Sequence, residues 1–295
     1  MRRRKSLLTV FLVLISAATF GVTTLATSGG GPTKRLAPKP QARAAPAFKK
    51  TKFQPACVNP TYPSPAPATA PSIDSECGLA GAGVGAEGQQ DMTKNNFCAK
   101  GTPKPITVAD LTALQAKVEA NPAINFGSAN KGTRKKGPTT NRAPLKKLGE
   151  GKLVTLSNVY VLIARQEGGE SVNCGTNIEN HALMHDIHIS LVSSPDVTDE
   201  CSSVVAEMSP HHRPDTWTHG NVEKVAKAKL PVRVTGQLYF DSSHFPCSGG
   251  QGAGAGNPKR MALWEVHPVY KFEVCTADCG GAGQWVTLDK WAASN

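Results

Sequence analysis

Apolar and polar residues alternate with a period of two along several stretches of the second half of the chain. Successive side chains of a strand point to opposite faces, so this alternation, together with many β-branched and aromatic residues, predicts β-strands. The predicted strands span residues 152–166, 181–194, 202–209, 231–241 and 260–274.

One helix is predicted between the third and fourth strands. In residues 221–230, Val222 and Val225 fall on one side, and Asn221 is a candidate N-cap. The order strand–strand–strand–helix–strand–strand is the layout of an OB-fold, so the predicted class is mainly β with an OB-like five-stranded barrel. Gly236 suits a strand that bends in a barrel. A small β-sandwich is the alternative, and the helix counts against it.

The N-terminal residues predict export. Basic residues are followed by an apolar stretch, as in a signal peptide, so we expect a periplasmic, cell-envelope or secreted protein. An uncleaved membrane anchor is the alternative. The predicted organisation is a signal peptide at 1–28, a disordered tether rich in Pro, Ala and Lys at 29–72, a small cysteine-containing helical extension with a basic loop at 73–150, the barrel at 151–279 and a C-terminal tail at 280–295.

The extension contains one predicted helix. In TVADLTALQAKVEANP, Leu111, Leu114 and Val118 recur at spacings of three and four. Asp110 lies near the N-terminus of this run, and Pro122 ends it. The sequence therefore predicts a small helical cap beside the barrel.

Export determines how the eight cysteines are interpreted. An even number of cysteines in an exported chain favours disulfides over free thiols. The chain has no paired C-x2-C knuckles, which a zinc ribbon would need. We therefore predict structural disulfides, and the sequence leaves their pairing open.

The net charge of +11 is unevenly distributed. Residues 1–52 hold eleven Lys or Arg and no acid, whereas residues 148–275 hold ten bases and fourteen acids. The predicted barrel is therefore mildly acidic, which weakens a role in binding nucleic acid. A contact with a polyanion would fall on the basic segment 131–147, at Lys131, Arg134, Lys135, Lys136, Arg142, Lys146 and Lys147.

Polar residues interrupt the apolar strands. In MALWEVHPVYKFEVC (261–275), Glu265 and His267 are two residues apart and point to the same face of a strand. Asp186 and His188 share a face of the second strand in the same way. A buried carboxylate is costly unless it is paired or bound to a metal, so we expect these groups to compensate one another.

These interruptions define the candidate site. Carboxylates with imidazoles are the ligand set of a divalent transition ion such as zinc, manganese or iron, and equally provide a general acid and base. The favoured interpretation is a structural hydrogen bond between Glu265 and His267 that tethers the last strand to His188 or Arg233, and a functional polar site is the alternative. The candidate catalytic residues are His188, Glu207, Asp241, His244, Glu265 and His267, and the candidate metal ligands are His188, His244, Glu265 and His267.

Other motifs receive structural interpretations. His185 is expected to be a half-buried strand histidine, and His211 and His212 are expected in a solvated loop. The stretch GVGAEG at 83–88 matches G-x-G-x-x-G but follows no predicted strand, so no dinucleotide cofactor is predicted.

The glycine-rich stretch at 247–260 is interpreted as a flexible loop. The alternative is that Lys259 and Arg260 contact a phosphate or a sugar acid. No nucleophile motif such as G-x-S-x-G occurs, so covalent catalysis is not predicted.

The stretches HDIHISL, VTGQLYFDSSH and WEVHPV resemble strands of a set of uncharacterised exported bacterial proteins, over roughly residues 180–275. E-x-H-P-V is the most specific of these motifs, and the set has no function to transfer. In its fold the chain is also similar to the barrel of staphylococcal-nuclease-type enzymes. Their Asp and Arg arrangement is missing here, so this similarity implies a fold and not nuclease activity.

Three functions follow from these observations. The first is an exported binding or structural module, tethered to the envelope. The second is a metal-assisted hydrolase, acting on phosphodiesters for example, that uses the His/carboxylate cluster. The third is a binder of polyanions or nucleic acid through the basic segment 131–147.

Overall fold

The computed structural model describes part of the chain, and the predicted signal peptide and nearly all of the tether lie outside it. The described residues are 72–74, 77–124, 137, 139, 141–173, 185–211, 213, 214, 216–247 and 258–295. The strands are β1 Ser72–Asp74, β2 Cys77–Gly78, β3 Lys104–Ile106, β4 Leu153–Gln166, β5 Ile187–Val192, β6 Val204–Met208, β7 Pro231–Phe240, β8 Trp264–Ala277 and β9 Gln284–Thr287. The helices are α1 Gly85–Lys94, α2 Val108–Ala120, α3 Ala143–Leu148, the 3-10 helix η2 Glu200–Ser202, α5 His219–Ala228 and α6 Leu288–Ala293.

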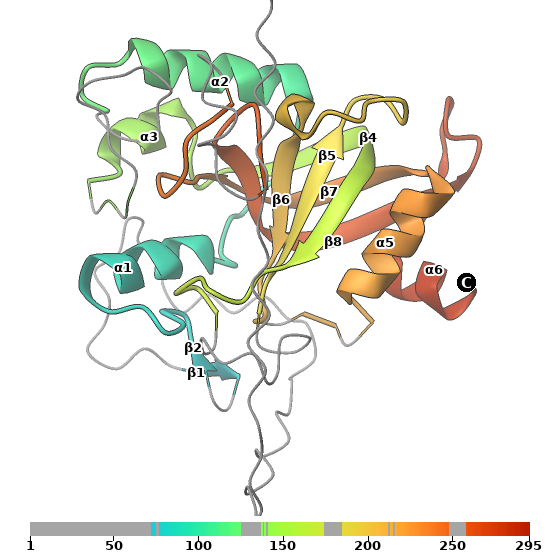
Figure 1. The fold of residues 1–295 in the computed structure, drawn as a ribbon, viewed down its shortest axis with the longest axis horizontal. Coiled ribbons are helices and arrows are strands. Elements are labelled where there is room, and N and C mark those ends of the chain that lie inside the picture. Colours follow the sequence, from blue (N-terminus) through green and yellow to red (C-terminus); the bar gives the residue numbers. More distant parts are fainter. Residues whose placement is uncertain are drawn as a thin grey trace, which may run out of the picture. The chain divides into compact units, whose positions relative to one another are not determined.

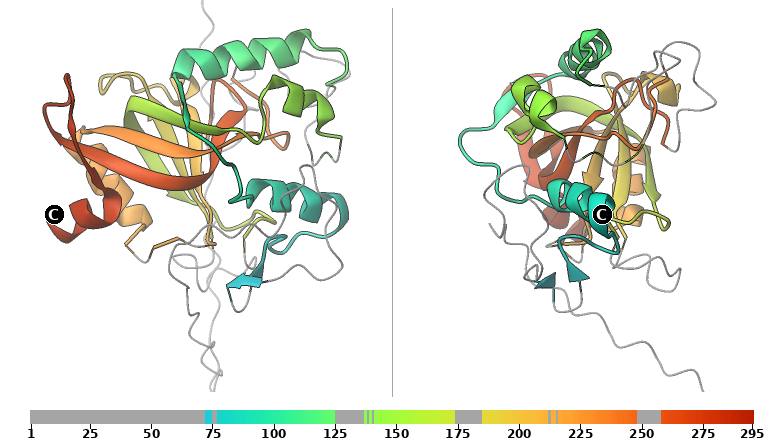
Figure 2. Two further views of the ribbon diagram at one scale, coloured as in Figure 1. Left: turned by 180° about the vertical axis from the view of Figure 1, so that it is seen from behind. Right: turned by 90° about the vertical axis from the view of Figure 1, so that its left-hand side faces the viewer.

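Five strands close into a barrel. The order is β4–β5–β6–β8–β7, and β7 pairs back with β4 (Figure 1). The β6–β8 pair is parallel and the other four pairs are antiparallel. Figure 2 shows the same barrel from behind and from one side. With α5 between β6 and β7 in the chain, this is the layout of an OB-fold, and the predicted fold class is confirmed.

The barrel elements differ from the prediction mainly at their ends. The second strand begins at Ile187 rather than 181, and residues 181–184 lie outside the described part. The last strand begins at Trp264, because the residues before it form a bend in which Met261 N–H donates to the carbonyl of Ser203. Helix α5 begins at His219, and its N-cap is not Asn221.

Side-chain caps set the starts of two helices. The hydroxyl of Thr218 accepts a hydrogen bond from Asn221 N–H, so Thr218 caps α5. Thr107 and Asp110 form a reciprocal capping box at the start of α2. Helix α2 is the helix that the sequence predicts in the extension.

Two segments are more ordered than the sequence indicated. The predicted C-terminal tail forms β9, which pairs with β8, and α6, which buries Leu288 and Trp291. The predicted basic loop includes α3, and Arg142 at its start is buried with its guanidinium on the carboxylate of Glu150. Arg142 is therefore not available to a polyanion, contrary to its place in the predicted contact. Lys146 and Lys147 are exposed, and the other predicted contact residues lie outside the described part.

Two disulfides connect described cysteines, Cys201–Cys247 and Cys275–Cys279. They confirm the prediction of structural disulfides and indicate an oxidising, exported environment. Among the described residues, no helix has the length and apolar character needed to cross a membrane.

The three strands that carry the polar interruptions are buried on both faces. Ile187 and Ile189 of β5, Ala206 of β6, and Trp264 and Val266 of β8 belong to the hydrophobic core. The alternate residues point to the other side of the barrel wall. These alternate residues are also buried, so the outer face of the wall here is covered.

Helix α1 covers this outer face. Gln237 of β7 donates from Nε2 to the carbonyl of Thr93 at 2.9 Å. Ser209, just after β6, donates from its hydroxyl to Asn95 Oδ1 at 2.6 Å. These bonds hold the C-terminal end of α1, and therefore Lys94, against the wall.

Candidate metal centre

The strand register brings the polar interruptions together. His188 of β5 lies directly opposite Glu207 of β6, and Val205 of β6 is paired with Glu265 of β8. Glu207, Glu265 and His267 are therefore neighbours on the outer face of the wall. His188, Glu207, Glu265 and His267 are each at most 1% exposed.

Three carboxylates converge around one imidazole nitrogen. His188 Nε2 lies 3.3 Å from Glu207 Oε1, 3.4 Å from Asp186 Oδ2 and 3.6 Å from Glu170 Oε1. Glu170 comes from the loop after β4 and Asp186 immediately precedes β5. These side chains form a group whose ligand atoms all lie within 4.8 Å of one another, and we call them the cation group.

The contacts within the cation group are ion-pair contacts of 3.3–3.6 Å rather than well-aligned hydrogen bonds. Both ring nitrogens of His188 and both carboxylate oxygens of Asp186 and of Glu207 lack an aligned hydrogen-bond partner within the described part of the chain. Buried polar atoms are normally satisfied, so each of these exceptions calls for an explanation. Ligand atoms that face a common centre without bonding one another are the arrangement expected around a cation.

The distances also fit a metal ion. For metal–ligand bonds of about 2.0–2.1 Å, adjacent ligand atoms of a tetrahedral site lie about 3.3 Å apart. The three distances from His188 Nε2 run from 3.3 to 3.6 Å. One imidazole and three carboxylates suit a divalent ion such as zinc or manganese.

Lys94 occupies the other side of two of these carboxylates. Its Nζ lies 3.1 Å from Glu170 Oε2 and 3.6 Å from Glu207 Oε2. The Oε1 atoms, which face His188, remain directed toward the centre of the cation group. One ammonium therefore does not satisfy these two carboxylates fully.

Burial and neighbouring charges shift the pKa values in opposite directions. Burial alone would lower the pKa of His188, but the carboxylates of Glu207, Glu170 and Asp186 raise it well above 6.5. Burial would raise the pKa of Glu207, but His188, Lys94 and His267 hold it well below 4.5. Without a metal, the imidazolium of His188 thus helps to neutralise the cation group.

In a second group around Glu207, the charges are compensated by neighbouring side chains. His267 Nδ1 lies 2.7 Å from Glu207 Oε2 and makes an aligned hydrogen bond of 3.1 Å with Glu265 Oε1. Arg260 Nη1 donates to Glu265 Oε2 at 2.8 Å. Burial and Glu207 raise the pKa of Glu265 to about 7, while Glu207 raises that of His267 to about 9 against the effect of burial. Ligand atoms of Glu207, Glu265 and His267 also lie within 4.8 Å of one another, but their mutual contacts and Arg260 already compensate their charges.

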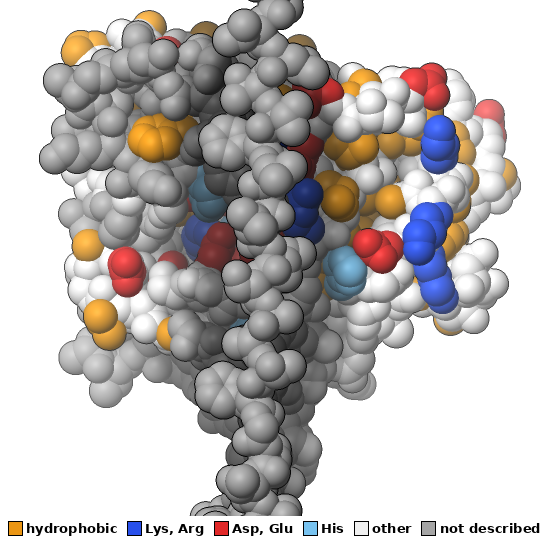
Figure 3. All heavy atoms as spheres, in the orientation of Figure 1, with side chains coloured by type: hydrophobic (Ala, Val, Ile, Leu, Met, Phe, Trp, Pro, Cys, Tyr) orange, Lys and Arg blue, Asp and Glu red, His pale blue; other side chains and the backbone are white. Residues whose placement is uncertain are grey.

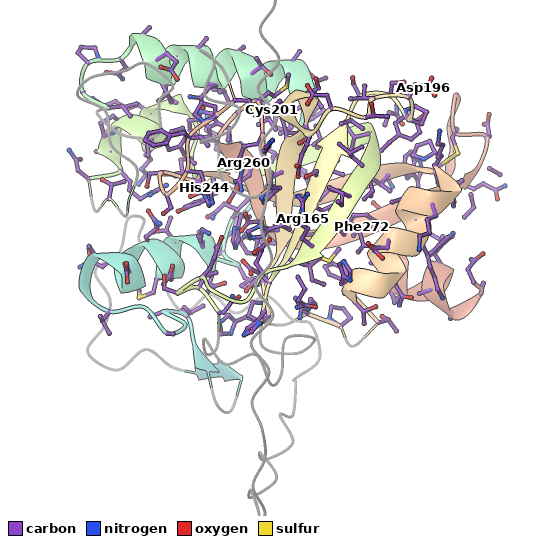
Figure 4. All side chains as sticks on the ribbon, viewed as in Figure 1. Arg165, Asp196, Cys201, His244, Arg260 and Phe272 are labelled. Atoms are coloured by element: carbon purple, nitrogen blue, oxygen red, sulfur yellow. A yellow bond between two sulfur atoms is a disulfide. The ribbon has the colours of Figure 1, made fainter. Side chains whose placement is uncertain are left out.

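Asp241 and His244 form a separate pair in the loop after β7. His244 Nδ1 is hydrogen-bonded to Asp241 Oδ2, and Arg260 Nη1 donates to the same oxygen at 3.1 Å. Ser243 N–H donates to Asp241 Oδ1 at 2.9 Å. Arg260 therefore connects this pair to Glu265 of the second group, and Figure 4 labels His244 and Arg260 near each other beside the barrel.

The predicted site residues thus fall into connected sets with different surroundings. Glu207 joins His188 to Glu265 and His267, whereas His244 belongs to neither cation-sized group because Asp241 binds its Nδ1. Sequence reasoning did not select three residues that complete the site, namely Lys94, Glu170 and Asp186. Asp186 was recognisable from its place two residues before His188, whereas Lys94 and Glu170 stand in segments without periodicity.

Several expectations about individual residues are wrong. His185 and His211 are buried, at 0% and 1% exposed, rather than half-buried and solvated. His211 N–H donates to the hydroxyl of Ser209, which draws this residue against the end of β6. His212 lies outside the described part.

The arginine that binds the last strand at Glu265 is not the one considered for that role from the sequence. Arg260 is not a loop residue open to a phosphate, because its guanidinium is fully buried among Asp241 and Glu265. Arg233 binds Glu273 instead, at 2.7 Å and 2.9 Å. The tether of Glu265 is therefore Arg260, not Arg233.

A cavity of about 490 Å³ lies beside the cation group. Its lining is largely polar and includes Gln90, Asp91, Lys94, Glu170, Ser243 and His244. Figure 3 shows acidic, basic and histidine side chains together in a hollow of this face. Glu170 belongs both to the cation group and to the cavity, so a bound ion would be approached from this side.

No protein family, curated protein or solved structure matches the chain. The resemblance through E-x-H-P-V therefore stays a prediction. The barrel and the His/carboxylate cluster fit a binding module or a metal site, and the finer assignment depends on the geometry of the cation group.

Proposed function

We propose that the protein is an exported binding module whose OB-like barrel holds one divalent transition metal ion at Glu170, Asp186, His188 and Glu207. The observation that carries this proposal is the convergence of four ligand atoms on a common centre without aligned hydrogen bonds among them. A divalent ion would neutralise the buried carboxylate oxygens that Lys94 does not contact.

The main competing function is a structural module whose polar network only stabilises the barrel. The surroundings of Asp186 distinguish the metal-binding module from the structural module. Its carboxylate is fully buried, its oxygens make no aligned hydrogen bond among the described residues, and its closest charge partner is His188 Nε2 at 3.4 Å. Three carboxylates of the cation group, Glu170, Asp186 and Glu207, face the two cations His188 and Lys94, so the metal-free group retains an uncompensated buried negative charge, which is unfavourable. Residues retained at such a cost are typical of functional sites.

The experiment is metal binding by the oxidised protein and its Asp186→Asn variant. Elemental analysis after equilibration with Zn²⁺ or Mn²⁺ should give one equivalent for the wild type and none for the variant. A metal concentration 100 times Kd should raise the free energy of unfolding of the wild type by about 2.7 kcal/mol and leave that of the variant unchanged. The metal-free variant should be at least as stable as the metal-free wild type.

Glu223→Gln is the matched control. Glu223 is a carboxylate on α5 whose side chain is 39% exposed and whose partner is His219 at 3.5 Å, and it belongs neither to the cation group nor to the cavity lining. This variant should bind metal as the wild type does. A wild type that takes up no metal, with Asp186→Asn less stable than the wild type, would establish the structural module instead.

A further inference from the structure

The loop after β7 places a proton acceptor on the cavity beside the cation group. His244 lines this cavity with a side chain that is 16% exposed, and Asp241 holds its Nδ1. Within the described residues, Nε2 of His244 makes no hydrogen bond. An imidazole oriented through one nitrogen by a carboxylate can accept a proton at the other.

The buried carboxylate of Asp241 fixes the orientation of the His244 ring. Asp241 is fully buried, and each of its oxygens is held by a donor, Ser243 N–H at 2.9 Å and Arg260 Nη1 at 3.1 Å. Asp241 therefore has little freedom to turn, and the ring that it binds keeps its Nε2 side available to the cavity. A surface histidine would not need such a buried support.

The cation group opens onto the same cavity. Glu170 has a side chain that is 24% exposed and lines the cavity, whereas those of His188 and Glu207 are fully buried. An ion at this group would have its accessible side toward the cavity. Lys94 also lines the cavity, so an ion, an ammonium and an oriented imidazole would share one space.

Size and charge indicate the kind of molecule that this space accepts. The volume of about 490 Å³ falls in the range of small-molecule sites, and the polar lining favours a hydrophilic ligand. In the absence of an ion, Glu170 and Glu207 neutralise Lys94. A divalent ion would displace the proton of His188, so metal binding adds one net positive charge and the metal-bound protein accepts an anion more readily than the metal-free protein. The oxygens of a phosphate ester could bind both a metal ion and the ammonium group of Lys94 at the side of the cavity next to the cation group.

We propose that this cavity hydrolyses a phosphate ester, with His244 as the general base; the proposal rests on the metal site proposed above. His244 Nε2 takes a proton from a water molecule whose oxygen forms a bond to phosphorus. The bond from phosphorus to the ester oxygen breaks, and the leaving oxygen takes a proton from solvent water. The imidazolium of His244 then gives its proton to the hydroxide that remains, which regenerates the base. Glu170, Asp186, His188 and Glu207 would hold a metal ion that polarises the phosphoryl oxygens, and Asp241 orients His244.

The test uses the oxidised full chain loaded with Zn²⁺ or Mn²⁺. The probes are bis(p-nitrophenyl) phosphate, p-nitrophenyl phosphate and, as a carboxylic ester, p-nitrophenyl acetate. We expect metal-dependent hydrolysis of a phosphate probe, reduced about 100-fold or more by His244→Gln. His244→Gln should retain one equivalent of metal, and Asp186→Asn should lose both metal and hydrolysis. His219→Gln, whose side chain on α5 is 36% exposed and does not line the cavity, should retain both.

The outcomes separate the two proposals. Metal binding without hydrolysis of a phosphate probe would overturn the hydrolytic role and leave the metal site standing. Hydrolysis that His244→Gln leaves unchanged would overturn the role of the base, and hydrolysis of the acetate alone would overturn the substrate class. A wild type without metal would overturn the metal site, and the hydrolytic role with it.

Discussion

Arg260 holds two buried carboxylates, and its removal should be among the most damaging single changes to the barrel. Its Nη1 lies 2.8 Å from Glu265 Oε2 and 3.1 Å from Asp241 Oδ2, and all three side chains are fully buried. Breaking a buried ion pair by deleting one partner costs about 3–5 kcal/mol, because the remaining charge is left without compensation. Arg260→Met retains much of the volume, so most of the loss should come from the charge.

The expected loss of stability depends on whether each carboxylate can take up a proton when Arg260 is removed. Burial and neighbouring acids already raise the pKa of Glu265 to about 7, so this group can take up a proton once Arg260 is gone. Asp241 cannot do so easily, since His244 and Lys94 hold its pKa far below 3.8 despite burial. We therefore expect a loss of about 3 kcal/mol at pH 7, toward the lower end of the range.

The assay is urea unfolding of oxidised, metal-free protein at pH 7. Arg233→Met is the control, because Arg233 is 31% exposed in its pair with Glu273 and should cost about 1 kcal/mol. The double variant Arg260→Met/Glu265→Gln should regain part of the loss. If Arg260→Met were no more destabilising than Arg233→Met, the reasoning about uncompensated buried charge would be refuted.

Three further changes test other parts of the structure. Burial raises the pKa of Asp91 from 3.8 to about 7, so the folded protein favours the protonated form and loses stability as the pH rises between these values. The Asp91→Asn variant should therefore be more stable than the wild type by up to about 4 kcal/mol at pH 8 and by little at pH 4. An equal effect at both pH values in urea unfolding would contradict this. A Cβ on Gly236 would lie 2.3 Å from the carbonyl oxygen of Pro268, so Gly236→Ala should lower the free energy of unfolding by about 3 kcal/mol, and an unchanged urea midpoint would show that the barrel bends differently. Replacing Cys201 and Cys247 by Ser opens a bridge with a sequence separation of 46 and should cost about 2–4 kcal/mol in thermal unfolding, whereas no loss would mean that the unfolded chain is not constrained there.

The barrel was predictable because its strands carry strong local signals. The alternation in 231–241 and the β-branched run in 152–166 reproduce β7 and β4 closely, since one face of each strand must enter the core. The order of elements then leaves few topologies. The strand ends were less predictable, because the bend before Trp264 depends on a contact between Met261 and Ser203 that is remote in sequence.

The candidate site was predictable only in part, for a physical reason. Glu265 and His267 stand out because they interrupt an apolar strand, and the strand period places them on one face. Lys94 ends a helix with two glycines and few apolar residues, and Glu170 lies in a loop, so neither has a local pattern that marks it. What brings both to the barrel is tertiary packing of α1 and of the loop after β4, and local sequence does not encode it.

The same limit explains the misplacement of Arg260. It follows a glycine-rich stretch, which locally predicts an exposed loop. Burial of Asp241 and Glu265 requires a cation nearby, and the sequence alone did not indicate which of several arginines would supply it. The carboxylates that interrupt the predicted strands show that a cation must lie near them, but they do not show which residue provides it.

The most direct test of the metal site is anomalous diffraction from crystals of the oxidised protein grown with Zn²⁺ or Mn²⁺. We predict one strong peak at about 2.0–2.2 Å from Glu170 Oε1, Asp186 Oδ2, His188 Nε2 and Glu207 Oε1. Crystals of Asp186→Asn should lack it. A wild-type map without a peak at this position, or with the only peak at His244, would contradict the assignment.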